Sequence, residues 1–182
     1  MIQKRFPKPQ GLYDPANEHD NCGIGFVANI KGVKTHDIVQ RGLEVLVNMT
    51  HRGAESSDNK SGDGAGILMQ VPHELCASFG FNLPAPGQYA TGLLFLPKGE
   101  KDAAACQDIL SKHIVNEGLE LIGFRDVPVD STVIGEIAGR TEPTIRQVFV
   151  KGNYEQDTLE RKLYITRKLT ESEVRNSAIA DK

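Results

Sequence analysis

Residues 22–30 read Cys-Gly-Ile-Gly-Phe-Val-Ala-Asn-Ile, and this stretch decides the fold expected for the chain. Its large apolar side chains alternate, with Ile24, Phe26 and Ile30 on one side and Val27 on the other. Alternation with a period of two indicates a β-strand, and apolar residues on both sides indicate a mostly buried one. We therefore expect the first core strand over this stretch.

The residues before this strand have a different character. Residues 1–21 are polar, contain several prolines and show neither helical nor strand periodicity, which is typical of an extended leader. They also lack the apolar run of a secretory signal peptide, so we expect a cytoplasmic protein. The sequence thus predicts a leader over 1–21 and one domain from residue 22 to 182.

Helical and strand patterns alternate after residue 30, as in an α/β or α+β domain. A helix capped by Thr35 is expected to end near Thr50, and a polar, glycine-rich segment then leads into a short strand at 67–71. Farther along, the patterns predict helices over 73–79, 100–117 and 154–174, and strands over 90–96, 119–127 and 144–150.

Composition excludes several classes of function. The 182 residues carry a net charge of −3 without a basic face, which argues against nucleic acid as a partner. The apolar runs are far shorter than the ~20 residues of a membrane span. Three cysteines without CxxC spacing and five scattered histidines give no disulfide framework and no metal site.

The expected strand and helix bring Arg52 back toward Cys22. A strand over 22–30 extends about 30 Å at ~3.3 Å per residue, and the helix returns about 22 Å at ~1.5 Å per residue. Arg52 could then orient the cysteine or favour its thiolate. On local grounds alone, a buried core position is the more common role for Cys22, and Arg52 could equally be a surface charge at a helix end.

The glycine-rich segment Ser61-Gly62-Asp63-Gly64-Ala65-Gly66 indicates a tight backbone turn or a close approach. A phosphate-binding loop is the obvious alternative. Such a loop needs a helix N-terminus after its glycines and usually a lysine, whereas here a strand pattern follows. Nucleotide binding is therefore disfavoured.

Three motifs together resemble one family. Residues 22–28, His51-Arg52-Gly53-Ala54 and residues 61–67 are similar to the opening of the class II glutamine amidotransferase domain of glutamate synthase large subunits, and residues 11–21 resemble that family's propeptide. The similarity extends to about Arg167. It implies an α+β fold of the Ntn-hydrolase type: a partial αββα sandwich with mostly antiparallel sheets between helical layers.

The resemblance also implies a chemistry. Cleavage before Cys22 would free an α-amino group on the residue that carries the thiol, and this amine, with a pKa of ~7.7–8.0, could act as the base. Cys22 would be the nucleophile in glutamine hydrolysis, and Arg52 would organise its surroundings. Binding or structural positions carry over to Gly23, Gly53, Asp63 and Gly64.

The family's oxyanion hole uses an Asn-Gly pair, and its substrate clamp uses a His-Ser-Arg segment; neither occurs in these 182 residues. We therefore expect the isolated chain to be inactive. The implied partners are glutamine, the remainder of the large subunit and the small subunit. The FMN, iron–sulfur cluster and NAD(P)H of glutamate synthase would belong to those other parts, and no cofactor is expected here.

Two other functions stay open at this point. One is a non-catalytic module that keeps part of the fold and binds a partner or regulates it. The other is a thiol redox protein, which is disfavoured because a resolving cysteine at CxxC spacing is missing.

Overall fold

The computed structural model describes residues 8–11, 23–62 and 64–179. Most of the expected leader, together with Cys22 and Asp63, lies outside these residues. The chain divides into two compact units, residues 1–68 and 69–182, and each is considered by itself.

The first unit contains helix α1, His36–Asn48, followed by the 3-10 turn η2, Thr50–Arg52. Both match the helix predicted from the apolar spacing, although Thr35 makes no side-chain capping bond. The strands predicted over 22–30 and 67–71 are wrong: none of the described residues in these two stretches is in a β-strand, and Glu55 and Gly62 form an isolated antiparallel bridge in the loop between them.

The reason lies in what a strand requires. A strand is stabilised by hydrogen bonds to a neighbouring strand and by burial of its side chains. Residues 23–30 have neither: they pair with no strand, and Ile24, Phe26 and Ile30 are 93%, 89% and 103% exposed. The predicted burial of these side chains is therefore wrong as well, because only Val27 of this stretch is half-buried.

The second unit is built on a three-stranded antiparallel sheet in the order β1-β3-β2. Strand β1 is Tyr89–Leu96, β2 is Glu120–Asp126 and β3 is Thr144–Lys151, all close to their predicted positions. A bulge interrupts β2 between Leu121 and Gly123. A β-carbon on Gly123 would lie 2.6 Å from Cε1 of Phe81, so this position requires glycine.

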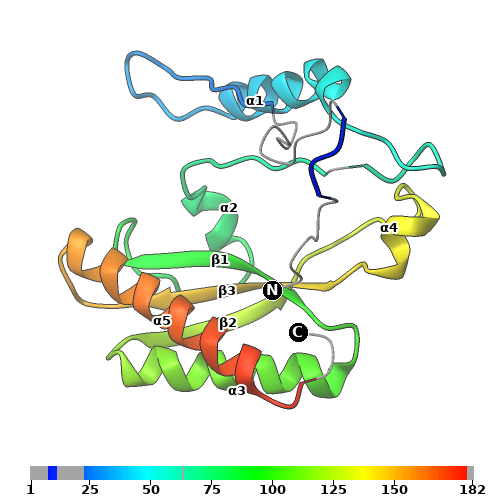
Figure 1. The fold of residues 1–182 in the computed structure, drawn as a ribbon. Helices are drawn as coiled ribbons and strands as arrows, with labels where there is room; N and C mark the ends of the chain where they lie inside the picture. Colours follow the sequence, from blue (N-terminus) through cyan, green and yellow to red (C-terminus); the bar gives the residue numbers. More distant parts are fainter. Residues whose placement is uncertain (1–7, 12–22, 63, 180–182) are drawn as a thin grey trace. The chain divides into compact units, whose positions relative to one another are not determined.

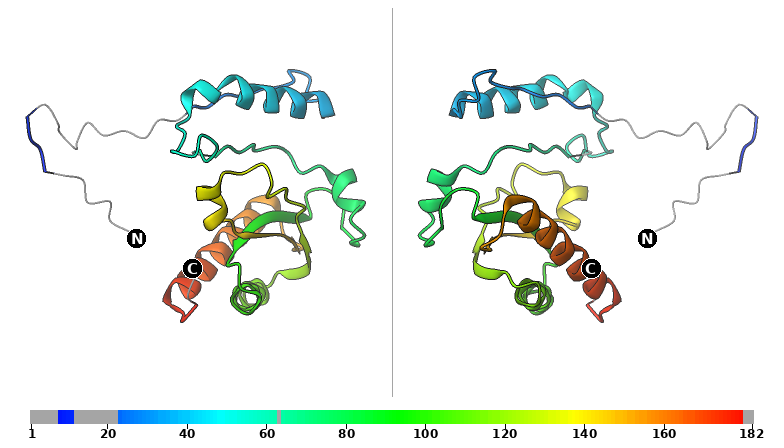
Figure 2. Two further views of the ribbon diagram at one scale, coloured as in Figure 1. Left: turned by 90° about the vertical axis from the view of Figure 1, so that its right-hand side faces the viewer. Right: turned by 90° about the vertical axis from the view of Figure 1, so that its left-hand side faces the viewer.

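Two helices cover one face of this sheet (Figure 1). Helix α3, Glu100–Asn116, and helix α5, Gln156–Asn176, pack against each other and against the central strand; Figure 2 shows α3 nearly end-on beside the sheet. The core between them contains Leu110, Ile114, Leu119, Val148, Val150 and Leu159. The spacing of these residues is helical in α3 and alternating in β3, as the sequence indicated.

Within the described residues of the second unit, the opposite face of the sheet is covered at one end only. The short helix α2, His73–Ala77, and Phe81 pack there around the buried Phe149 of β3. Farther along β1, Leu93 and Phe95 stay 54% and 67% exposed. A further helix that the sequence did not predict, α4 at Glu136–Arg140, precedes β3.

Polar contacts also join α3 to α5. Lys112 Nζ and His113 Nε2 each lie 2.8 Å from the Glu173 carboxylate, and the bond from Lys112 is the main reason why the pKa of Glu173 lies below its ordinary value. Among the described residues, no helix, α5 included, is both long and apolar enough to cross a membrane.

Thr166 of α5 gives a stability prediction. It is 4% exposed, and its Oγ1 finds no hydrogen-bond partner within the described residues. An unpaired buried hydroxyl costs about 1–3 kcal/mol, so Thr166→Val should raise the thermal midpoint by a few degrees. Thr170→Val is the matched control, because it removes the 2.8 Å bond from Thr170 Oγ1 to the Thr166 carbonyl and should not stabilise. A lower midpoint for Thr166→Val would contradict the prediction.

Candidate active site

The segment after Cys22 lies against α1 with two glycines facing the helix. A β-carbon built on Gly25 would lie 2.6 Å from Cγ1 of Val45. One built on Gly23 would lie 3.1 Å from the Met49 sulfur and 3.4 Å from Cβ of Arg52. The backbone therefore approaches the helix more closely at Gly25 than any residue with a side chain would allow.

The turn η2 places Arg52 at this position. Helix α1 ends at Asn48, and the Arg52 amide donates to the Met49 carbonyl at 2.8 Å. Thr50 Oγ1 also donates to the Val47 carbonyl at 2.7 Å, which ties the turn to the last turn of the helix. Arg52 thus lies beside Gly23, one residue from Cys22, as the lengths of the expected strand and helix had indicated.

The loop after η2 is held together by Asp58. Its carboxylate accepts hydrogen bonds from the Ser61 amide at 2.8 Å, the Lys60 amide at 3.1 Å and the Ser61 hydroxyl at 2.6 Å. The Ser56 amide also donates to the Ser61 carbonyl at 2.7 Å, which closes the loop. This role of Asp58 was not predicted, although the run Ser-Ser-Asp-Asn at 56–59 is typical of such side-chain-stabilised turns.

The predicted glycines differ in what they require. Gly64 has φ +79°, a left-handed conformation that favours glycine, and a β-carbon on Gly62 would lie only 3.2 Å from the Ala54 carbonyl oxygen. At Gly53 a β-carbon would make an ordinary 3.6 Å contact with the Thr50 carbonyl oxygen. The structure thus gives no steric reason for glycine at position 53, whereas at Gly23 the backbone lies close to the Arg52 side chain.

The other two cysteines are poor nucleophiles. Cys76 is 1% exposed and Cys106 is 8% exposed, and burial raises the pKa of both thiols. The raised pKa leaves little thiolate near neutral pH, and the thiolate is the reactive form. Cys76 is also hydrogen-bonded to Tyr89, whose hydroxyl lies 3.0 Å from Nδ1 of His73. Neither thiol is placed for chemistry, which leaves Cys22 as the candidate.

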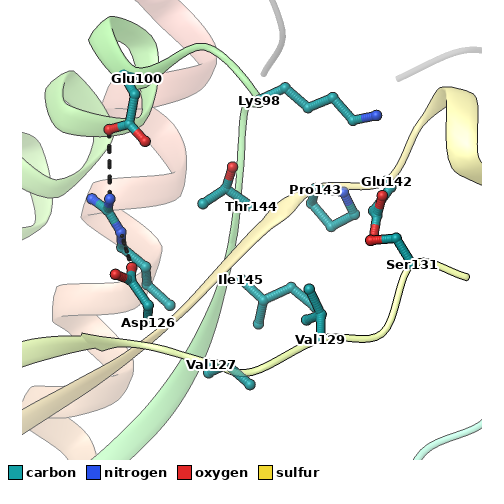
Figure 3. A pocket seen from close by; sticks show the side chains of 11 residues that line it. Lys98, Glu100, Asp126, Val127, Val129, Ser131, Glu142, Pro143, Thr144 and Ile145 are labelled. Atoms are coloured by element: carbon teal, nitrogen blue, oxygen red, sulfur yellow. Dashed lines mark hydrogen bonds and ion pairs between the residues drawn. The ribbon is translucent and has the colours of Figure 1, made fainter.

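A surface hollow of about 360 Å³ in the second unit is no rival site (Figure 3). Its charged side chains are already paired: Arg146 Nε lies 2.8 Å from Asp126, and Lys98 Nζ donates to the Gly139 carbonyl at 2.8 Å. Across the described part of the chain, no group of three His, Cys, Asp or Glu residues could hold a metal ion.

Comparisons with known proteins agree with these observations. The family model described as class II glutamine amidotransferases matches residues 22–182. The glutamate synthase [NADPH] large chain of Bacillus subtilis is 41% identical over 179 residues, covering 94% of this chain and 12% of that protein. The glutamate synthase [NADH] of Saccharomyces cerevisiae is 43% identical over 178 residues, covering 89% of this chain and 8% of that protein.

A third relative, the glutamate synthase [NADPH] large chain of Azospirillum brasilense, is 38% identical over 176 residues, covering 93% of this chain and 12% of that protein. The chain therefore spans only 8% to 12% of the length of these curated relatives.

Proposed function

This chain belongs to the class II glutamine amidotransferases, and we propose that residues 22–182 form the first part of a domain that hydrolyses glutamine to glutamate and ammonia. The observation that carries the proposal is the contact of Gly23 with Arg52. It brings the aliphatic base of the Arg52 side chain to the residue that follows Cys22, and the guanidinium is carried on that side chain. The burial of the other two thiols supports the same assignment.

The reaction divides into two steps at Cys22. The thiolate attacks the side-chain amide carbon of glutamine, and the C–N bond breaks after a proton is delivered to the leaving nitrogen, which departs as ammonia. Water then attacks the γ-glutamyl thioester, releases glutamate and restores the thiol. The α-amino group of Cys22, freed by removal of residues 1–21, accepts and returns the protons.

Arg52 has the role of holding the nucleophile's surroundings and favouring the thiolate, because a nearby guanidinium stabilises the negative form of a thiol. Gly23 keeps room beside the sulfur. Asp63 and Gly64 form the floor of the pocket in this proposal, and the left-handed backbone at Gly64 supports a tight turn there. A role for Gly53 in the site has the weakest support, since the space around it would accept a side chain.

The sheet of the second unit supports the two-sheet αββα architecture as part of the proposal. Helices α3 and α5 already form one outer layer, and the exposed Leu93 and Phe95 mark the face on which a second sheet would pack. The exposed Ile24, Phe26 and Ile30 are apolar side chains that such a sheet would cover if residues 23–30 joined it as a strand.

In a complete glutamate synthase, the ammonia would pass to a second site for the amination of 2-oxoglutarate. FMN, an iron–sulfur cluster and NAD(P)H would be bound by the remainder of the large subunit and by the small subunit. A cytoplasmic location completes the proposal.

A glutaminase assay on two proteins tests the function. The first is the 182-residue chain alone, which should release no ammonia above background, because a lost oxyanion donor alone costs about 10²–10³ in rate. The second is the Bacillus subtilis large chain with its matching segment replaced by this chain, and it should release ammonia. A chimera that folds and loses residues 1–21 but releases no ammonia would favour a non-catalytic, partner-binding module.

A further inference from the structure

Helix α1 and η2 present one stripe of residues to the segments that flank them. Gly42, Val45, Met49 and Arg52 are spaced by three and four residues, so they share one face. Gly25 and Gly23 lie against Val45, Met49 and Arg52, and Ile67 Cδ1 would lie 2.9 Å from a β-carbon on Gly42. The stripe therefore contacts the chain on both sides of the candidate site.

The contact at Gly25 is the most restrictive of these. Val45 Cγ1 is 2.6 Å from the position of a β-carbon, and valine in a helix is confined largely to one χ1 rotamer, so it cannot easily move aside. The Met49 side chain is more adaptable, because it has three rotatable bonds. Val45 thus controls how closely residue 25 approaches the helix.

The same contact fixes the register of the segment. A slip by one residue would turn the side chains of Ile24 and Phe26 toward α1, where even a methyl group at residue 25 has no room. Gly23 and Gly25, two residues apart, are the positions at which the backbone lies against this stripe. Gly23 is consequently held at Arg52, and Cys22 follows directly.

We propose that Val45 is a positioning residue: by seating Gly25, it fixes the register of residues 23–27 along α1 and so holds Gly23, the residue after the proposed nucleophile, beside Arg52. This inference rests on the proposed role of Cys22. It adds a residue that acts on the site through the Gly25 backbone.

Alkylation of cysteine thiols in the intact 182-residue chain tests the proposal without requiring glutamine hydrolysis. The rate of Cys22 modification by iodoacetamide is measured against pH by peptide mass spectrometry. Cys76 and Cys106 are internal controls, because both are buried and should react slowly as long as the second unit is folded.

Gly25→Ala should slow Cys22 alkylation at pH 7 by about five- to tenfold and move the midpoint of its pH profile upward, toward the ~8.5 of an ordinary thiol. Adding Val45→Ala to Gly25→Ala should restore the alkylation rate and the midpoint of the pH profile, because the smaller side chain makes room for the new methyl group. Adding Val47→Ala instead should restore neither, since Val47 is 71% exposed on another face of α1.

The proposal is overturned if Gly25→Ala keeps the wild-type pH profile. It is also overturned if adding Val45→Ala does not restore Cys22 alkylation in the Gly25→Ala chain, or if adding Val47→Ala restores it equally well. Rescue by Val45→Ala alone excludes simple misfolding as the cause. A failure of the proposed glutaminase function would appear separately, as absent ammonia release from a chimera whose Cys22 alkylation follows the expected pattern.

Discussion

Replacing Cys22 with alanine is expected to abolish glutamine hydrolysis by the chimera with the Bacillus subtilis large chain, with a loss of about 10³-fold or more in kcat. Alanine removes the atom that forms the thioester, and the neighbouring Arg52 cannot replace it. Ammonia release from glutamine is the measurement.

Cys106→Ala is the matched control for this substitution. Its thiol is buried beside Leu96 and Ala103 in the second unit, so its loss should lower stability modestly and leave the rate of ammonia release nearly unchanged. If Cys22→Ala kept more than a tenth of the wild-type rate, the hydrolysis would have to use another nucleophile.

Displacing the free α-amino group is expected to have the second largest effect. A chimera with one additional alanine before Cys22 moves the amine by one residue, about 3.8 Å along the chain. A positioned acid–base group contributes about 10²–10⁴-fold in rate, so kcat should fall by at least 10². A chimera from which residues 1–21 are not removed should be at least as impaired, because its α-amino group stays in a peptide bond.

The control for the amine is a chimera in which a specific protease site replaces residues 16–21. Before cleavage it should be silent, and cleavage directly before Cys22 should restore ammonia release. Equal activity before and after verified cleavage would show that the α-amino group is not the base.

The sequence predicted the second unit well because its signals are local. The apolar spacing within residues 100–117 and 144–150 depends only on the face that each element buries, and both elements lie close to their predicted positions. The strands predicted over 22–30 and 67–71 did not form, because pairing depends on a partner strand that a local pattern does not contain. Helix α4 was missed, since Ile137 is its one large apolar side chain and Gly139 disfavours a helix.

The candidate site was predictable in outline only. The lengths of the expected strand and helix were enough to return Arg52 toward Cys22, and the structure places Arg52 at Gly23. The fit of Gly25 against Val45 was not predictable, because a glycine in a sequence does not indicate which atom it leaves room for. The role of Asp58 depends on loop hydrogen bonds that have no periodic signal.

The central claim is that the Cys22 thiol forms a covalent bond with the side-chain amide carbon, Cδ, of glutamine, and trapping tests it most directly. The mature chimera is incubated with a glutamine analogue that carries an electrophile in place of the side-chain amide, and the modified peptide is identified by tandem mass spectrometry. The account predicts one adduct, on Cys22, whose formation is prevented by excess glutamine. An adduct on Cys76, on Cys106 or on a residue of the other segments, with Cys22 unmodified, would contradict it.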